Sequence, residues 1–226
     1  MQMGETGRDA QSKEAKGEEA QTDYHQAMAL IYYQKKGNSM TNYIIYSRPG
    51  EVNDGFPAGK LGNMAGGFPF EALGRTWKSS EFLYLLGWWS GSDTANIAIQ
   101  EDVLSANNGF VAKRFKKAKH KRVARPDFVD WRHEWMTWVV WQKCIGNADF
   151  RELLLATGDN TIVEVVKRDP VWAAWPDENG NYVGANGMGR ILMACREALR
   201  TNTVPTIDTN KLNEAGIWIL GQKVQF

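Results

Sequence analysis

Four tryptophans lie along one stretch of the chain at intervals that fit a helix. Trp131, Trp135, Trp138 and Trp141 follow one another four, three and three residues apart, within residues 127–144. At about 100° per residue they fall within roughly a third of a helix circumference. Such a stripe usually faces a hydrophobic core, so we predict a long helix that buries the last three of these indoles.

The rest of the chain is predicted to be mainly helical with a small β component. Amphipathic or capped patterns predict helices over residues 78–89, 93–104, 107–121, 149–156 and 190–200, and β-prone runs occupy 41–46 and 161–166. Two stretches rich in glycine and proline, 47–76 and 170–190, are predicted loops. Ser79 or Ser80 and Asp149 are the expected helix caps. We expect a single α+β domain.

The chain is predicted to divide into three parts. Residues 1–39 begin with a stretch almost without apolar side chains, so we expect a disordered or dispensable extension. Residues 40–200 are the predicted domain, and residues 201–226 are a predicted tail that packs on it and adds a strand. Two cysteines, no long apolar run and no signal pattern favour a cytoplasmic protein without a membrane segment.

A basic run is hidden within an almost neutral chain. The chain carries 27 basic and 26 acidic side chains, but residues 113–125 hold eight Lys and Arg, one His and no acid, so the remainder has an excess of about seven acids. A patch of this kind indicates a phosphate-bearing ligand or a nucleic acid. A solvated helix face against acidic neighbours is an equal alternative.

Few known catalytic motifs are present, and a group of carboxylates and tryptophans remains. The three histidines are far apart in the sequence, and there is no phosphate-binding glycine motif, so we expect neither a metal nor a cofactor. Glu81, Asp169, Trp172 and Asn186 each lie at the end of a predicted element beside a loop. Carboxylates bind ribose hydroxyls and indoles stack on bases, which suits a nucleotide-like ligand. Helix-dipole compensation by Glu81 and a turn at Asp169 are the structural alternatives.

An ordered series of short motifs resembles the NADAR (YbiA-like) family. The series consists of Trp77–Glu81, Ala112–Arg114, Asp130–Trp131 with Met136 and Lys143, Leu153–Thr157, Val163–Glu164, Asp169–Trp172, Asn186–Gly189, Leu192–Met193 and Arg196–Glu197. Asn63 is similar to the asparagine of an early Ser-Asn-Phe motif in that family.

The resemblance implies a mainly helical YbiA-like domain that hydrolyses N-glycosidic bonds to ribose phosphates. Family substrates are riboflavin-pathway intermediates and ADP-ribose attached to guanine, so the implied partner is a nucleotide-like small molecule or an ADP-ribosylated nucleic acid. Glu81 and Asp169 are the expected catalytic residues. The expected substrate-binding residues are Asn63, Lys113, Arg114, Trp131, Trp172 and Asn186.

The chain departs from the family in the helix after Glu81. The family pattern E-[HY]-x-x-Q-x-x-K places glutamine and lysine where this chain has Leu85 and Trp88. If that lysine forms a Schiff base in relatives, this chain must use another amine, such as Lys78 or Lys113, or lack activity. The alternative function is a non-catalytic module that binds NAD-derived or ADP-ribosylated ligands. Because position 88 lies about two turns after Glu81, we expect Trp88 to approach the same pocket.

Overall fold

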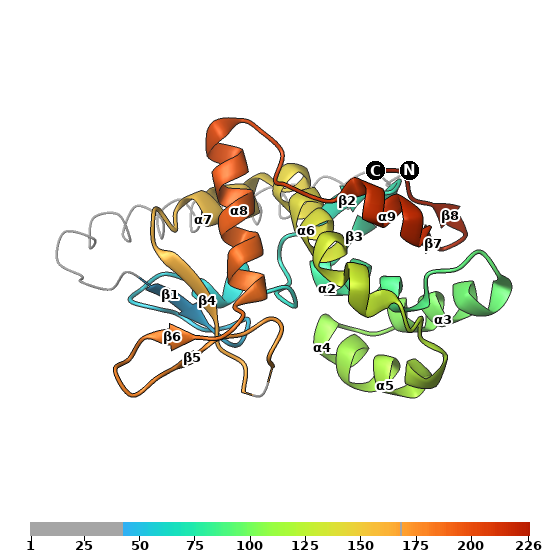
Figure 1. Ribbon diagram of the computed structural model, residues 1–226, viewed down its shortest axis with the longest axis horizontal. Helices are drawn as coiled ribbons and strands as arrows, with labels where there is room; N and C mark the ends of the chain where they lie inside the picture. Colours follow the sequence, from blue (N-terminus) through green and yellow to red (C-terminus); the bar gives the residue numbers. More distant parts are fainter. Residues whose placement is uncertain (1–42, 168) are drawn as a thin grey trace, which may run out of the picture. The chain divides into compact units, whose positions relative to one another are not determined.

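A computed structural model describes residues 43–167 and 169–226 (Figure 1). Residues 43–53 and 57–226 belong to one compact unit, which contains the candidate site. The predictions for residues 1–39 fall outside the described residues. None of the helices in the described ranges is both long and apolar enough to cross a membrane.

Helices make up about half of the described residues of this unit. They are α2 (Ser80–Leu86), α3 (Thr94–Leu104), α4 (Gly109–Val111), α5 (Lys117–His120), α6 (Phe128–Gly146), α7 (Ala148–Leu155), α8 (Gly187–Thr201) and α9 (Thr209–Ala215). Short 3₁₀ turns span Ala58–Leu61, Gly87–Trp89 and Lys121–Val123, and a π turn spans Ala112–Lys116. The predicted helices at 78–89, 93–104, 127–144, 149–156 and 190–200 are thus present with shifted ends. The expectation of a mainly α fold with a small β component is confirmed.

The tryptophan helix is the centre of the core. Helix α6 contacts α2, α7, α8, α9 and β2 (Figure 1). Trp131 and Trp135 are buried, but Trp138 and Trp141 are only half-buried, so the predicted burial of the stripe is wrong in its second half. The elements that pack against α6 cover only part of the Trp138 and Trp141 side chains. Trp138 stacks on Trp135, at 5.1 Å between ring centroids. The ring of Phe226 packs nearly perpendicular to the Trp138 ring.

Within residues 43–167 and 169–226, the strands form four small pairs. They are β1 (Tyr43–Tyr46) with β4 (Thr161–Glu164), β2 (Phe70–Ala72) with β3 (Arg75–Trp77), β5 (Trp175–Pro176) with β6 (Tyr182–Val183), and β7 (Trp218–Ile219) with β8 (Gln222–Lys223). The β1–β4 pair is parallel and joins segments more than 100 residues apart. Its register sets Tyr46 opposite Glu164, at the end that faces the site.

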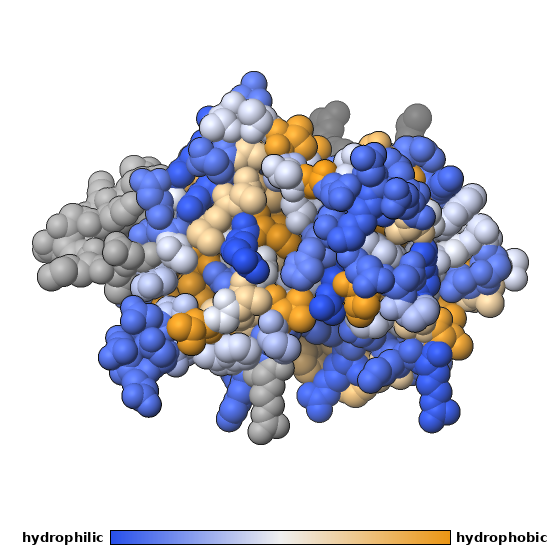
Figure 2. Space-filling view, in the orientation of Figure 1, coloured by the Kyte–Doolittle hydropathy of each residue, from blue (hydrophilic) through white to orange (hydrophobic). Residues whose placement is uncertain are grey.

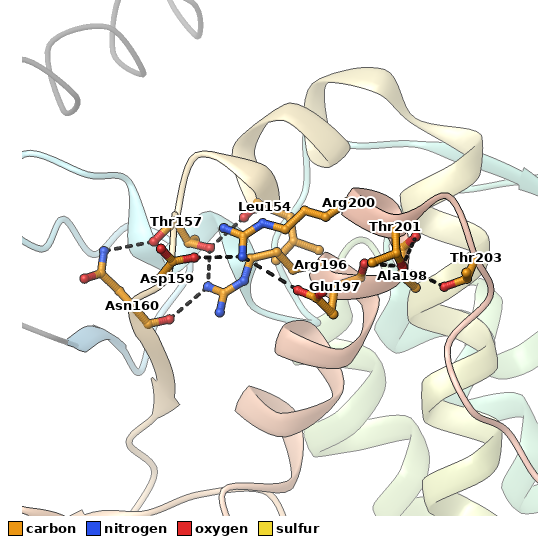
Figure 3. Close-up of polar contacts among 10 residues, drawn as sticks. All are labelled: Leu154, Thr157, Asp159, Asn160, Arg196, Glu197, Ala198, Arg200, Thr201 and Thr203. Carbon is orange, nitrogen blue, oxygen red and sulfur yellow. Dashed lines mark hydrogen bonds and ion pairs between the residues drawn. The ribbon is translucent and has the colours of Figure 1, made fainter.

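Helix α8 holds β4 in place from above. Gly189 allows the close approach, because a Cβ there would lie 2.1 Å from the carbonyl oxygen of Ile162. Further along α8, the buried Arg196 donates to Thr157 Oγ1 at 2.7 Å and to the carbonyl oxygen of Asn160 at 2.8 Å (Figure 3). These bonds fix the loop between α7 and β4, and therefore the position of the strand.

Several local predictions need correction. The single helix expected over residues 107–121 is interrupted by the π turn, where the Lys117 amide donates to the carbonyl oxygen of Ala112. Helix α7 is capped by Asn147 rather than Asp149, because the Asn147 side chain accepts from the Phe150 amide. Ser79 occupies the position before α2 but makes no capping hydrogen bond. Helix α9 was not predicted.

The tail after α8 lies along the domain. Helix α9 contacts α6, and Gln100 of α3 donates to the Trp218 carbonyl oxygen at 3.0 Å. Arg125 donates to the carbonyl oxygen of Ala215 at 2.8 Å. On the face seen in Figure 2, hydrophilic residues dominate, with smaller hydrophobic patches between them, including the region around α4 and α5.

Candidate active site

A cavity of about 580 Å³ opens where the β1–β4 pair, α2, the π turn and the loop after β4 meet. Its volume is in the range of small-molecule sites. Its lining includes Tyr46, Arg48, Asn63, Glu81, Tyr84, Asn108, Phe110, Lys113, Met136, Glu164, Asp169, Trp172 and Met188. Five predicted site residues therefore meet in one place: Asn63, Glu81, Lys113, Asp169 and Trp172.

Glu81 is the most buried carboxylate of the site. It is 3% exposed, and its Oε2 accepts a hydrogen bond from Asn63 Nδ2 at 2.7 Å. Among the residues that the structure describes, Glu81 Oε1 and Asn63 Oδ1 are buried without a hydrogen-bond partner. A buried carboxylate oxygen without a partner lowers the stability of the folded protein, unless a ligand or a water molecule donates a hydrogen bond to it. The pair thus presents one free acceptor from each side chain at the cavity.

Local structure explains why Glu81 can lie there. It belongs to the first turn of α2, in which every residue is buried, and its amide donates to the Asn63 carbonyl oxygen at 3.1 Å. The positive end of a helix favours a carboxylate at this position. A Cβ on Gly109 would lie 3.2 Å from the Glu81 Cβ, so only a small residue fits opposite.

Asp169 and Trp172 are set by one tight turn after β4. Asp169 Oδ1 accepts from the amides of Val171 and Trp172, at 3.1 Å and 2.9 Å. Asp169 therefore has the turn role that the sequence analysis gave as an alternative. This role occupies one of its two carboxylate oxygens. The Trp172 ring meets the edge of Tyr84 at 5.8 Å and the ring of His133 at 4.7 Å. The indole is thereby held in one orientation at the cavity wall.

Glu164 is a third carboxylate in the cavity, and the sequence analysis assigned it no role. Burial is the main cause that raises its pKa to about 7, and the neighbouring carboxylates of Asp169 and Glu81 raise it further, against Lys113. It is the last residue of β4. The available signal was its place in the Val163–Glu164 motif, within the strand predicted over residues 161–166.

Two buried phenols add donors to this wall. Burial raises the pKa of Tyr46 well above its usual range, and Glu164 raises it further. Burial likewise raises the pKa of Tyr84, with Glu81 adding to the shift. Both hydroxyls therefore stay protonated at neutral pH. The Tyr46 hydroxyl has no partner among the described residues.

Two cations lie at the exposed side of the cavity. Lys113 comes from the π turn and Arg48 from the loop after β1, and both are exposed. Arg48 was not predicted, although it begins the long loop rich in glycine and proline. In the described ranges, no group of three or more His, Cys, Asp or Glu side chains could hold a metal ion.

The structure does not bring three predicted substrate-binding residues into the cavity lining. Trp131 is 2% exposed and packs edge-on against Phe128 at 4.7 Å. The Asn186 amide group donates to the Ile162 carbonyl oxygen at 2.8 Å and accepts from the Glu164 amide at 3.3 Å, so it joins α8 to β4. Arg114 is exposed and faces two phenylalanine rings.

Trp88 also lies outside the cavity lining, contrary to expectation. Helix α2 ends at Leu86, and residues Gly87–Trp89 tighten into a 3₁₀ turn. The cavity lining includes Glu81 but not Trp88. The indole packs on Phe128 at 4.7 Å, and Lys117 Nζ lies 3.6 Å from its ring centroid.

Comparison with known proteins places this arrangement in a family. The profile of the NADAR domain matches residues 61–200, which contain most of the cavity. The chain belongs to the NADAR family. It is 32% identical over 188 residues to the "Riboflavin biosynthesis protein VVA0006" of Vibrio vulnificus, covering 80% of this chain and 46% of that protein. The chain thus spans about half the length of that relative.

Smaller NADAR proteins match over most of their length. The N-glycosidase YbiA of Shigella boydii is 27% identical over 141 residues, which cover 62% of this chain and 81% of the relative. The NMR structure of Escherichia coli YbiA superimposes with a TM-score of 0.55 at 25% identity, covering 73% of this chain and 89% of that one. The match supports a single NADAR domain with the YbiA fold.

Proposed function

We propose that this NADAR protein is an N-glycosidase that hydrolyses the C–N bond between a base and a ribose carrying phosphate. The observation that carries the proposal is the buried pair of Glu81 and Asn63, with a free oxygen on each at a cavity of nucleotide size. Two free acceptors side by side suit the hydroxyls of a ribose. The names of the relatives support the same reaction class.

The proposed reaction uses three carboxylates in different roles. The bond from ribose C1′ to the base nitrogen breaks, and its electron pair stays on the nitrogen. Glu164, half-protonated near pH 7, gives that nitrogen a proton. Glu81 stabilises the positive charge that develops on the sugar. Water adds to C1′ and passes its proton to Asp169. Asp169 then releases this proton to solvent, and Glu164 takes one proton back from solvent, so that both groups return to their starting states.

The remaining residues bind the substrate. Trp172 stacks on the base, and Lys113 and Arg48 neutralise the phosphates. Asn186 acts as a positioning residue, since its side chain accepts from the backbone of Glu164. We infer no direct substrate contact for Trp131. These residues suit the two substrate classes that the family resemblance implies. The classes are ADP-ribosylated guanine and riboflavin-pathway intermediates.

Lys113 is the amine available for a covalent step, if one occurs. It lines the cavity, whereas Lys78 is exposed and outside the lining. Because the proposed reaction has water attack C1′ directly, treatment with borohydride during turnover is expected to give no adduct. An adduct on Lys113 that Lys113→Met abolishes would replace the direct attack with a covalent step.

Release of free base from both substrate classes, followed by chromatography and mass spectrometry, tests the proposal. Glu81→Gln keeps the shape and removes the charge, and it is expected to lower kcat at least a hundredfold. Glu152→Gln on α7 removes an exposed carboxylate outside the cavity lining and is the matched control. Full activity of Glu81→Gln on a substrate that the wild type cleaves would refute the role of Glu81.

A specific observation favours the second candidate, a binding module without catalysis. Trp88 stands where relatives have a lysine, and its indole lies outside the cavity lining. This candidate predicts calorimetric binding of ADP-ribose that depends on Trp172, with no base released from either substrate class.

A further inference from the structure

Tyr46 is a buried donor at the cavity that the proposed reaction does not use. The residue is 1% exposed and lines the cavity, and its hydroxyl has no hydrogen-bond partner among the described residues. Burial, with Glu164 adding to the effect, raises the pKa of Tyr46 well above its usual range, so the hydroxyl keeps its proton. A buried hydroxyl without a partner lowers the stability of the folded protein, and an acceptor on a ligand would offset this loss.

Tyr46 and Glu164 lie side by side in the cavity wall. They are opposite each other in the register of the parallel β1–β4 pair, and both belong to the cavity lining. Residues paired across two strands present their side chains on the same face of the sheet. With Glu164 protonated, as the proposed reaction requires, this part of the wall offers two hydrogen-bond donors. We call Tyr46 and Glu164 the donor pair.

The donor pair adjoins the acceptors of Asn63 and Glu81. A Cβ on Gly62 would lie 3.3 Å from Cε2 of Tyr46, so the phenol ring packs against the residue that precedes Asn63. Asn63 donates to Glu81 at 2.7 Å, which leaves one oxygen of each without a partner among the described residues. The cavity therefore has an acceptor side next to a donor side. A nucleoside whose ribose hydroxyls meet the acceptor side has its base at the donor pair.

We propose that Tyr46 donates a hydrogen bond to an acceptor atom of the base next to its leaving nitrogen. The site then selects bases in which that nitrogen belongs to an amidine, guanidine or amide-like group. As the bond from C1′ breaks, its electron pair spreads from the leaving nitrogen onto the neighbouring ring nitrogen or carbonyl oxygen, and a donor there stabilises the developing charge. Tyr46 keeps its proton throughout, and Glu164 protonates the leaving nitrogen. The inference rests on the proposed function for the role of Glu164, but recognition of the base can be measured without turnover.

Two isomeric bases test this recognition directly. In 2-aminopyrimidine the amino nitrogen has a ring acceptor on either side, whereas in 5-aminopyrimidine it has only C–H neighbours. NMR titration of the wild type is expected to show about tenfold tighter binding of 2-aminopyrimidine, the contribution of one hydrogen bond. Tyr46→Phe removes only the hydroxyl and should abolish this preference. Tyr43→Phe, the same change on the same strand outside the cavity lining, is the matched control and should keep it.

Thermal unfolding separates a ligand-binding role of the hydroxyl from a structural one. The Tyr46 hydroxyl has no partner among the described residues, so Tyr46→Phe should have an unchanged or higher thermal midpoint. A loss of several degrees would mean that the hydroxyl bonds within the fold, and it would overturn the inference. Equal binding of the two isomers, absence of binding included, or a preference that survives in Tyr46→Phe would overturn it as well.

Turnover distinguishes failure of this inference from failure of the proposed function. On a substrate whose leaving nitrogen adjoins an acceptor, Tyr46→Phe should lower kcat roughly a hundredfold, because a donor to the developing charge is lost. Glu81→Gln should lose turnover and keep the preference between the isomers. A preference for 2-aminopyrimidine without any turnover would refute only the proposed function. Turnover undiminished in Tyr46→Phe would overturn the inference and leave the proposed function standing.

Discussion

Lys143 is a buried lysine whose replacement should stabilise the protein. It lies on α6 with no exposed surface, and its Nζ has no hydrogen-bond partner among the described residues. Its Nζ lies 3.8 Å from the ring centroid of Phe150 and 5.2 Å from that of Phe68. Burial lowers its pKa from 10.5 to about 7. Lys143→Met keeps the length of the side chain and adds a thioether that packs well on aromatic rings.

The magnitude follows from proton linkage. Between pH 7 and 10.5 the unfolded chain keeps a proton on this amine that the folded chain has lost, so wild-type stability rises with pH. Each pH unit contributes up to 1.36 kcal/mol, which gives roughly 5 kcal/mol over the whole interval. The folded-state pKa already includes the attraction of the ammonium to the ring faces, so nothing further is subtracted. Lys143→Met should therefore be more stable by about 4 kcal/mol at pH 7.

Urea unfolding from pH 6 to 9.5 measures the effect. The stability advantage of Lys143→Met should shrink by about 2–3 kcal/mol between pH 7 and 9.5, because the wild-type amine becomes neutral in that range. Lys223→Met, at an exposed position, should show no such change in its difference from wild type. A variant that is destabilised equally at every pH would refute the reasoning, since the amine would then serve a packing role unrelated to its charge.

Three further predictions concern the site and its supports. With a pKa of about 7 for Glu164 in the free protein, kcat/KM should fall about tenfold per pH unit above 7 as the proton donor is lost, and Glu164→Gln should abolish this limb; a pH profile that keeps the limb in the variant would assign it to another group. Asn186→Ala removes two hydrogen bonds between α8 and β4 and should cost about 1–3 kcal/mol in urea unfolding; an unchanged midpoint would contradict its structural role. Deletion of residues 1–39 should leave the thermal midpoint and ligand binding unchanged, and a loss of several degrees would show that the segment contributes to the fold.

Local patterns were reliable where a single segment decides its own structure. The spacing of the tryptophans is a property of one helix, so the extent of α6 could be predicted without knowing its neighbours. The same holds for α3, whose cap Asp93 accepts from the Asn96 amide at 2.9 Å. The interruption at Ala112 could not be foreseen, because helix patterns do not distinguish i−4 from i−5 hydrogen bonding in a basic run.

The candidate site was partly predictable for the same reason. Local sequence reveals motifs and the ends of helices and strands. Motifs of this kind, at predicted element ends, contain Glu81, Asp169 and Trp172. Trp131 and Asn186 match motifs equally well, yet their side chains pack within the fold. A motif identifies a position that matters, but it does not separate a residue that meets a ligand from one that supports it.

The sequence by itself determined most of the helices, the basic run and the residue types available for chemistry, because these depend on composition and on spacing along one segment. Only the tertiary structure decided which of them meet. The parallel pairing of Tyr43–Tyr46 with Thr161–Glu164 brings Glu164 to the cavity and buries it, and burial is what raises its pKa toward 7. Contacts with Phe128 and Lys117, from segments later in the chain, hold the Trp88 indole outside the cavity lining. Desolvation and long-range pairing arise from segments far apart in the chain, so no local pattern carries them.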